Sequence, residues 1–503
     1  MRATRMLLIL AAVPGLAATC ESLASLTLPQ TTITLAESVA AGAFTPPAAT
    51  PAKAGSPSFQ DLPAFCRVAA TLKPTSDSDI KIEIWLPASG WNGKFQAVGN
   101  GGWNGNIVYP GLAQALGRGY ASSSTDTGHK GGSGSFALGH PEKLIDFGWR
   151  SEHEMTVKAK AIIAAFYGNS PRFSYWVGCS SGGKQGLMEA QRFPADYDGI
   201  VAGAPANYWT HLMVSFIWAA HATFKDPQNL IPPAKYPLLY KAALEACDRL
   251  DGVTDGVIED PPRCSFDPKV LACKDDADSP DCLTARQVEA ARKIYAGARN
   301  PRTGRQIFPG LPPGSERGWG AMAAGPKLFS IPDDHFKYVV FRDPNWDFRN
   351  FNFDSDVTLT DKLDNGTLNA IDPDLRKFAA RGGKLLLYHG WNDQLIAAGN
   401  SVNYYTSVLE KMGGRAKTAG WFRLFMAPGV NHCRGGDGPD TFDALAMVED
   451  WVEKGVAPDR IIASRRTEGR VDRTRPLCPY PQIAKYNGSG STDDAANFSC
   501  AAP

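Results

Sequence analysis

The chain contains 503 residues, of which 43% are hydrophobic and 20% are charged, with 52 Lys and Arg against 51 Asp and Glu. This composition is typical of a globular protein, and the balanced charge disfavours a nucleic-acid-binding protein, which usually carries a basic excess. The length suffices for a large buried core, arranged as one domain with an insertion or as two to three domains. After the N-terminal segment, no stretch is long and apolar enough to predict a membrane span.

Residues 1–19 have the pattern of a secretory signal peptide. Two arginines precede an apolar run over residues 6–13, and small residues follow up to Ala18. This pattern predicts cleavage near Ala18 or Thr19 and a mature protein that is secreted or periplasmic. A lipid anchor on Cys20 is the alternative, but Thr19 before that cysteine is a poor match to a lipidation signal.

Ten cysteines in an exported chain predict disulfide bonds, because the compartments outside the cytoplasm are oxidising. The count does not determine the connectivity, but short separations favour three local pairs. These pairs are Cys247 with Cys264, Cys273 with Cys282, and Cys478 with Cys500. Cys20 and Cys66 then remain for the N-terminal segment, while Cys179 and Cys433 depend on the catalytic residues considered below.

Strands and helices are expected to alternate along the first part of the chain, as inferred from the spacing of apolar residues. Residues 30–60 are rich in Thr, Ala and Pro and are expected to form an extended arm. The elements expected after the arm are strands at 80–86, 94–98 and 120–124, a helix at 152–166, a strand at 173–177, a helix that ends near residue 193, and a strand at 200–202.

The alternation stops at about residue 210 and returns after about residue 360. It returns with strands at 384–388 and 422–426 and with helices at 400–411 and 441–452. Strands that alternate with helices predict an α/β fold with a mainly parallel sheet. The interruption predicts a lid domain at 210–360, inserted between the two parts of one domain at 20–209 and 361–503.

A candidate nucleophile lies in the segment Gly178–Gly182, which has the form G-x-S-x-G between an expected strand and an expected helix. A serine on such a turn exposes its hydroxyl at the sheet edge, so Ser180 is the predicted nucleophile. The backbone N–H of Ser181 would point to the place where an oxyanion forms. The alternative is a Gly/Ser-rich turn without chemistry, which the two flanking elements disfavour.

A serine nucleophile needs a base and an acid that orients the base, in the chain order Ser, acid, His. His432 follows a late strand, and Asp393 follows the strand before it, so both are expected at the same sheet edge as Ser180. A turn or helix-cap aspartate and a structural loop histidine are the alternatives for Asp393 and His432. If Ser180 and His432 meet, their neighbours Cys179 and Cys433 come within disulfide range; a buried free thiol is the alternative for Cys179.

The dipeptides Cys179-Ser180 and His432-Cys433, with Asp393 between them in the chain, resemble those of the tannase and feruloyl esterase family of secreted α/β-hydrolases. The resemblance covers most of the chain. The resemblance implies an α/β-hydrolase fold with an inserted lid, a triad of Ser180, Asp393 and His432, and a Cys179–Cys433 disulfide. It also implies the pairs Cys20–Cys66, Cys247–Cys264, Cys273–Cys282 and Cys478–Cys500. The loop GNGGWNG matches the family's second oxyanion donor, for which Gly101 and Gly102 are the candidates.

A calcium site is expected in the lid. Asp248, Asp251 and Asp255 lie within eight residues, and carboxylates this close repel one another unless water or a cation neutralises them. Two Asp-Gly surface turns are the alternative. The resemblance implies a structural Ca²⁺ bound by these three side chains and by the carbonyls of Val253 and Val257. No organic cofactor is expected.

The resemblance implies esters of aromatic acids as substrates, with His389 and Ile396 at substrate-pocket positions. Lid aromatics could contact a planar acyl group, although most should be core: Phe329, Phe336, Tyr338, Phe341, Trp346, Phe348 and Phe351. A feruloyl esterase or tannase is favoured over a mono(2-hydroxyethyl) terephthalate hydrolase, whose carboxylate-binding lid arginine has only Arg342 as a candidate here. A non-catalytic, calcium-stabilised binding protein is the alternative of a different class, and a peptidase is a third. The sequence does not indicate the oligomeric state.

Overall fold

The structure is a computed structural model that describes residues 18–47 and 58–503. Most of the predicted signal peptide lies outside the described residues, as does the end of the predicted extended arm. The first part of that arm is a strand rather than a loose segment, because Thr31–Val39 pairs in antiparallel register with the strand Phe65–Leu72. The disulfide between Cys20 and Cys66 joins the N-terminal segment to this second strand.

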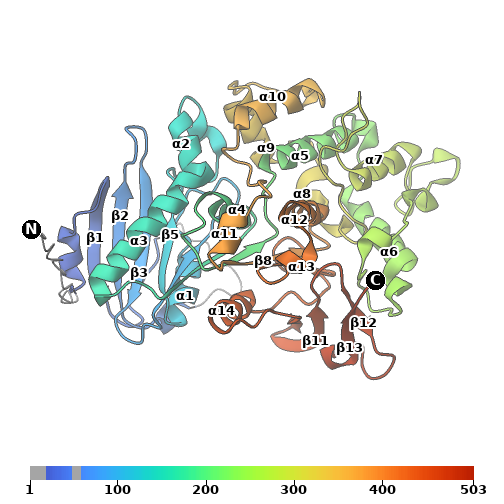
Figure 1. Ribbon diagram of the computed structural model, residues 1–503. Coiled ribbons are helices and arrows are strands. Elements are labelled where there is room, and N and C mark those ends of the chain that lie inside the picture. Colours follow the sequence, from blue (N-terminus) through green and yellow to red (C-terminus); the bar gives the residue numbers. More distant parts are fainter. Residues whose placement is uncertain (1–17, 48–57) are drawn as a thin grey trace, which may run out of the picture.

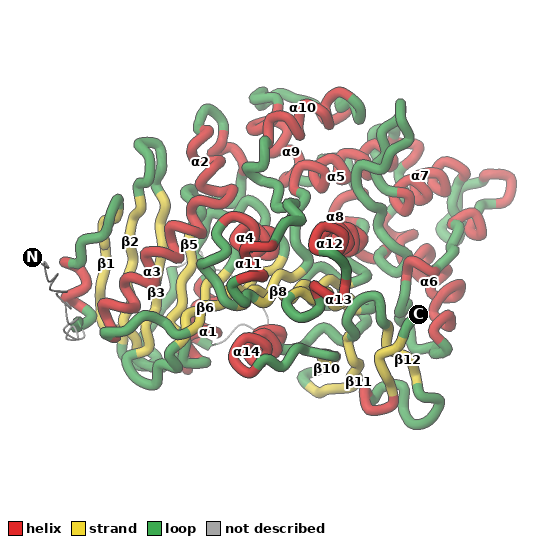
Figure 2. Tube along the Cα trace, viewed as in Figure 1, coloured by secondary structure: helices red, strands yellow, loops and turns green. Residues whose placement is uncertain are grey.

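A nine-stranded mixed sheet runs through the molecule in the order β1-β2-β3-β5-β4-β6-β7-β8-β9 (Figures 1 and 2). Its strands are β1 (Thr31–Val39), β2 (Phe65–Leu72), β3 (Ile80–Pro87), β4 (Lys94–Val98), β5 (Ala121–Thr125), β6 (Phe173–Cys179), β7 (Gly199–Gly203), β8 (Lys384–Gly390) and β9 (Phe422–Ala427). The pairs β1–β2, β2–β3 and β3–β5 are antiparallel. The remaining pairs, from β5–β4 to β8–β9 in the sheet order, are parallel. All carboxyl ends of β4 to β9 therefore lie at one edge.

The central strands are mostly buried because both of their faces are covered, and β7, β8 and β9 are largely apolar, whereas β5 consists mainly of Ser and Thr. In β8, Leu385 and Leu387 point into one hydrophobic core and Leu386 points into another. Alternation of this kind follows from the two-residue period of a strand. The first core is covered by α3 (Ser151–Tyr167), α4 (Ser181–Arg192), α11 (Arg376–Ala380) and α12 (Gly399–Met412), and the second by α1 (Tyr109–Gly117) and α14 (Ala444–Lys454).

A large insertion separates β7 from β8 and forms its own layer at one end of the sheet (Figure 1). Its α-helices are α5 (Trp209–Thr223), α6 (Tyr236–Cys247), α7 (Ala285–Ala296), α8 (Gly320–Ala323), α9 (Ser330–Asp334) and α10 (Ser355–Asp364). The core of the insertion includes Trp103 from the loop after β4. The Trp103 indole N–H donates to the carbonyl of Ile331 at 3.0 Å, so the insertion is anchored to that loop.

Two small sheets close the C-terminal part, and two short helices, α2 (Pro141–Ile145) and α13 (Arg415–Thr418), connect larger elements. One sheet pairs β10 (Ile461–Thr467) with β11 (Arg470–Leu477), and the other pairs β12 (Ile483–Tyr486) with β13 (Phe498–Ala501). The Cys478–Cys500 disulfide ties the end of the chain to these sheets.

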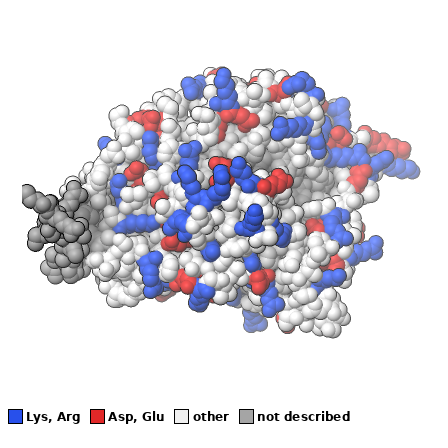
Figure 3. Space-filling view, viewed as in Figure 1, with Lys and Arg blue, Asp and Glu red and all other residues white. Residues whose placement is uncertain are grey.

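The face in view carries charged side chains of both signs (Figure 3). Among the described residues, no helix has the length and apolar character needed to cross a bilayer. Lysines and arginines are interspersed with acidic residues over the visible face (Figure 3). This mixed pattern agrees with the balanced composition of the chain.

Candidate active site

Ser180 lies on a sharp turn between β6 and α4, at the carboxyl edge of the sheet. Its backbone angles are φ 64° and ψ −123°, a conformation that is costly for a residue with a side chain. The turn is held by the Ser180 N–H, which donates to the carbonyl of Gly203 at 3.0 Å. Strain that the surrounding structure enforces in this way is typical of functional sites.

Glycines allow the segments around this turn to approach one another closely. A Cβ on Gly99 would lie 2.5 Å from the Cα of Gly182, and a Cβ on Gly183 would lie 2.4 Å from the carbonyl oxygen of Gly203. No other residue type fits at these positions without movement of the backbone. Gly99 and Gly182 thus allow the loop after β4 to pack against the start of α4.

Two sets of backbone N–H groups next to Ser180 are available to stabilise an oxyanion. The N–H of Ser181 opens α4, and those of Gly101 and Gly102 lie in the loop after β4; none of the three has an acceptor among the described residues. The Ser181 hydroxyl donates to the carbonyl of Gly102 at 3.0 Å and so joins the two segments. A Cβ on Gly101 would meet no atom within 4 Å, which places that residue beside open space.

Asp393 is a completely buried carboxylate in the loop after β8. One oxygen accepts from the backbone N–H groups of Leu395 and Ile396, both at 2.9 Å. The other accepts from His432 Nδ1 at 2.7 Å and from His389 Nε2 at 2.9 Å. Burial alone would raise the pKa of Asp393, but the two histidines and their hydrogen bonds outweigh it and hold the pKa well below its usual range.

His432 lies in the loop after β9 with its Nδ1 held by Asp393, and its backbone N–H donates to Gln394 Oε1 at 3.2 Å. Burial lowers the pKa of His432, but the charge and the hydrogen bond of Asp393 raise it further, so the net shift is upward. An imidazole held through Nδ1 keeps Nε2 free for proton transfer. His432 therefore has the environment of a general base that a carboxylate orients.

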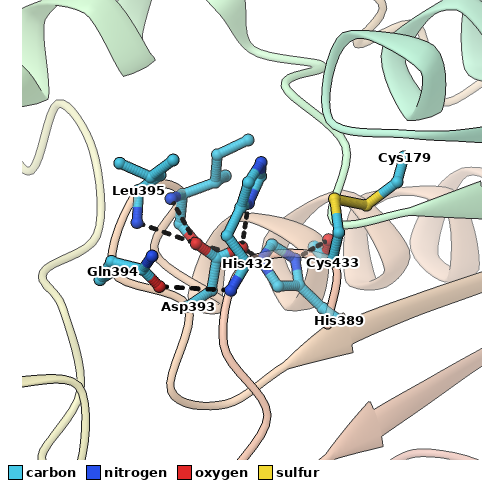
Figure 4. The surroundings of a disulfide bond; sticks show 9 residues. Cys179, His389, Asp393, Gln394, Leu395, His432 and Cys433 are labelled. Atoms are coloured by element: carbon cyan, nitrogen blue, oxygen red, sulfur yellow. Dashed lines mark hydrogen bonds and ion pairs between the residues drawn. A yellow bond between two sulfur atoms is a disulfide. The ribbon is translucent and has the colours of Figure 1, made fainter. Parts of the chain in front are cut away.

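A disulfide links the turn of Ser180 to the loop that carries His432 (Figure 4). Cys179 and Cys433 are bonded, with 6.0 Å between their Cα atoms, so the neighbours Ser180 and His432 are held in adjacent segments. The Ser180 hydroxyl forms no hydrogen bond with a described residue, including His432. Bonds of this kind often form only when substrate is present. All five disulfides expected for the chain are present in the structure.

His389 and Ile396, expected at pocket positions, lie behind Asp393 instead. The His389 side chain is completely buried and its Nε2 is shared between Asp393 and the carbonyl of Ile396, while its Nδ1 accepts from the Ser401 hydroxyl at 2.7 Å. Ile396 is 2% exposed. His389 thus supports the acid and presents no surface to a substrate in this structure. The sequence placed it near Asp393 but gave no indication of which way its ring points.

The insertion covers both loops that carry the candidate catalytic groups. A Cβ on Gly102 would lie 3.0 Å from Ile331, and one on Gly318 would lie 2.4 Å from the side chain of Gln394. Gln394, which the sequence did not single out, thereby joins the insertion to the backbone of His432. Only its position beside Asp393 could have drawn attention to it.

The predicted calcium loop has the donor groups that a hard cation requires. Burial and the nearby Asp255 raise the pKa of Asp251 to about 6, and no described donor reaches the carbonyls of Val253 or Val257. Both oxygens of Asp248 accept from backbone N–H groups of the loop. Asp255 instead forms ion pairs with two arginines, Arg473 and Arg475, which neutralise part of the local charge. The loop offers oxygen donors of the type that Ca²⁺ prefers, but the three carboxylates do not all lie within 4.8 Å of one another in this structure, so the calcium site stays a prediction.

A family model described as tannase and feruloyl esterase matches residues 66–501. The chain belongs to the tannase and feruloyl esterase family. It is 40% identical to an uncharacterized esterase of Xanthomonas campestris pv. campestris, over 96% of this chain and 91% of that protein. It is 36% identical to the probable feruloyl esterase B-1 of Aspergillus flavus, over 86% of each chain.

Solved structures agree with this family assignment. A crystal structure of feruloyl esterase B from Aspergillus oryzae has a TM-score of 0.90 and 31% identity, and covers 96% of this chain and 99% of that one. An esterase from the same organism gives a TM-score of 0.88 and 33% identity over the same shares. Tannin acyl hydrolase from Aspergillus niger shares the fold, with a TM-score of 0.79 and 24% identity over 95% of this chain and 93% of that one. This member of the tannase and feruloyl esterase family has the α/β-hydrolase fold and is a carboxylic ester hydrolase.

The Gly101 N–H can be tested as the second oxyanion donor by a matched pair of substitutions. Gly101→Pro removes the N–H, so we expect kcat to fall by about 10²–10³-fold, as is typical when one such donor is lost. Gly101→Ala keeps the N–H and adds a methyl group to open space, so it should retain most of the activity. Steady-state kinetics on both variants, with circular dichroism as a folding check, measures the difference. Equal rates for the two variants would contradict the assignment.

Proposed function

We propose that this protein is a secreted serine esterase that cleaves esters of aromatic acids, of the feruloyl esterase or tannase type, through Ser180, His432 and Asp393. The observation that carries the proposal is the disulfide that joins the strained Ser180 turn to the loop of His432, whose ring Asp393 holds. A binding protein would need none of these three features.

The proposed reaction consists of two acyl transfers. His432 Nε2 takes the proton of Ser180 as the hydroxyl attacks the ester carbonyl, and Asp393 stabilises the imidazolium that results. The N–H groups of Ser181 and of Gly101 or Gly102 stabilise the oxyanion. His432 then gives its proton to the leaving alcohol, and an activated water hydrolyses the acyl-enzyme in the same way.

Membership of the family supports aromatic acyl groups. In the insertion Phe336, Phe348 and Phe351 are buried in its core and cannot line an open pocket. Of the aromatic residues that the sequence analysis named, Phe329, Tyr338, Phe341 and Trp346 are only partly buried. These are the aromatic groups among the sequence candidates that have surface left for a substrate ring.

The terephthalate monoester hydrolase remains the second candidate. Arg342, the candidate for holding a free carboxylate, is exposed and forms no ion pair with a described residue. No carboxylate of the described residues pairs with its guanidinium, which is therefore available to a carboxylate of the substrate.

A hydrolysis panel decides among these substrates. We expect purified protein to cleave methyl ferulate or methyl gallate with higher kcat/KM than mono(2-hydroxyethyl) terephthalate and a short p-nitrophenyl ester. Preference for the terephthalate monoester would favour the second candidate. Activity on the p-nitrophenyl ester alone would contradict an aromatic-acid esterase.

Secretion is part of the proposal and rests on the N-terminal pattern and on the disulfides. Five disulfides among the described residues are typical of a protein that matures in an oxidising compartment. The size of the mature protein in the culture medium or periplasm, with its N-terminal sequence, would test both export and cleavage near Ala18 or Thr19.

Calcium is expected to stabilise the fold through the lid loop. Free Ca²⁺ at 100 times its Kd should raise the free energy of unfolding by about 2.7 kcal/mol over the chelated protein, because only the folded loop binds the ion. Asp251→Asn should abolish this response, since it removes a carboxylate ligand. Thermal unfolding with calcium and with chelator measures both.

Asp267→Asn is the matched control, because Asp267 lies on the surface of the same insertion and pairs with Arg292. It should respond to calcium like the unaltered protein. A calcium response that survives in Asp251→Asn would assign the ion to another place.

A further inference from the structure

A second cluster of ionisable side chains lies between α3 and α4, on the face of the sheet that these helices cover (Figure 1). His153 comes from α3, Glu189 from the last turn of α4, and Asp196 from the turn that follows α4. One ligand atom from each residue lies within 4.8 Å of the others. The cluster is separate from the triad loops and from the predicted calcium loop.

Glu189 is the unusual member of this cluster. Its side chain is 1% exposed, and neither carboxylate oxygen has a hydrogen-bond partner. A buried carboxylate without a partner is costly, so such a group calls for an additional cation or proton. Burial first, and then the neighbouring Asp196 and Glu152, raise the pKa of Glu189 well above its usual range.

The other two members are already held in place. His153 Nδ1 lies 2.7 Å from Asp196 Oδ2, and the imidazole stacks on Phe193 with 3.8 Å between the ring centroids. The His153 side chain is 28% exposed, so an ion could enter from solvent. Packing that fixes the direction of a ligand is typical of metal sites.

We propose that His153, Glu189 and Asp196 bind a divalent transition-metal ion, with Zn²⁺ as the best match. One imidazole and two carboxylates form a donor set that suits Zn²⁺, whereas Ca²⁺ and Mg²⁺ prefer oxygen ligands alone. Ligand atoms bound about 2.0–2.2 Å from one Zn²⁺ ion lie closer to one another than the 4.8 Å limit within which these three atoms now lie. The cluster therefore contracts slightly when the ion binds. Water completes the coordination.

The basic side chains near the cluster leave the Glu189 carboxylate without an ion pair, so the local charge favours a bound cation. The charge of Lys160 acts on Glu189, but its ammonium donates to the backbone carbonyl of Asp196 and to no carboxylate oxygen among the described residues. Arg381 likewise binds the carbonyls of Pro194 and Tyr197 and the carboxylate of Asp198. The Glu189 oxygens are left without a positive partner, and a bound divalent ion would neutralise both carboxylates of the cluster.

The site would act as a cross-link between two helices. The ion joins α3 to the end of α4, the helix whose first residues form the turn of Ser180. This role is structural, because the ligands lie at the opposite end of α4 from that turn.

Metal titration of the untagged, chelator-treated protein tests the site. With excess Ca²⁺ present to fill the lid loop, we expect the protein to bind one equivalent of Co²⁺ with visible absorption bands, and Zn²⁺ to displace it. Glu189→Gln, which keeps the shape of the side chain, should weaken binding at least about 100-fold, since loss of a group that only orients a ligand typically costs roughly 10–100-fold. His153→Ala should do the same, and its partial exposure makes loss of the fold unexpected.

Glu154→Gln is the control, because Glu154 lies on the same helix and pairs with Lys158 outside the cluster. It should bind Co²⁺ like the unaltered protein. Absence of stoichiometric binding, or binding equal in Glu189→Gln and the unaltered protein, would overturn the proposal. In that case an infrared band of a protonated carboxyl that disappears in Glu189→Gln would show that a shared proton occupies the pair. Esterase activity is measured separately, so neither result depends on the proposed reaction.

Discussion

Ser180→Ala should lower kcat on an aromatic-acid methyl ester by about 10⁶-fold, because loss of a serine nucleophile removes the covalent route as a whole. The oxyanion donors and the binding pocket remain, so a small residual rate above that of water is expected. The stability should change little, since the Ser180 hydroxyl has no partner among the described residues. Steady-state kinetics with thermal unfolding measures both quantities.

A fluorophosphonate probe makes this test specific for the residue. It should label the unaltered protein at Ser180, as peptide mass spectrometry would show, and should not label Ser180→Ala. Ser407→Ala is a suitable control, because that serine only donates to a carbonyl within α12. A folded protein that resists the probe and hydrolyses no ester would favour the alternative of a binding protein on a hydrolase scaffold.

Asp393→Asn should lower kcat by about 10⁴-fold, the loss typical when the acid of a triad is replaced by its amide. The amide can donate to His432 Nδ1, which would leave the imidazole in the wrong tautomer. His389 also bonds to Asp393, so the change disturbs both rings. The kinetic loss should appear in kcat more than in KM, because the acid lies behind the histidine and away from the substrate.

The pH dependence of kcat/KM gives an independent test of the role of Asp393. His432 accepts a proton only when neutral, so kcat/KM should rise with pH through the pKa of His432. Asp393 raises that pKa, so the acidic limb of the unaltered enzyme should lie above the ordinary histidine value of roughly 6.5. In Asp393→Asn the limb should move to lower pH. An unchanged limb would mean that Asp393 does not set the charge state of the base.

The alternating strands and helices could be predicted from the sequence because most central strands are rich in apolar residues and most covering helices carry apolar residues at helical spacing. The order of Ser180, Asp393 and His432 could be predicted for the same reason: each follows such a strand. The hydrogen bond between Asp393 and His432 and the Cys179–Cys433 bridge then follow from adjacency at one sheet edge.

Other features depend on packing that local sequence does not encode. The strand Thr31–Val39 lies at the sheet edge and is only partly buried, so its apolar signal is weak. The role of His389 depends on the direction of its ring in a closed core. The isolation of the Glu189 carboxylate could not be predicted either, because it arises only when α3 and α4 pack together.

The contacts of the insertion with Gly102 and Gln394 carry a consequence for protein engineering. A chimera that received the insertion of a relative would exchange the partly buried aromatic residues of the insertion and the supports of both catalytic loops in one step. An exchange of the insertion would therefore change the substrate range and the turnover together. Graft boundaries that retain the native Ile331 and Gly318 contacts would give the host loops their own supports back.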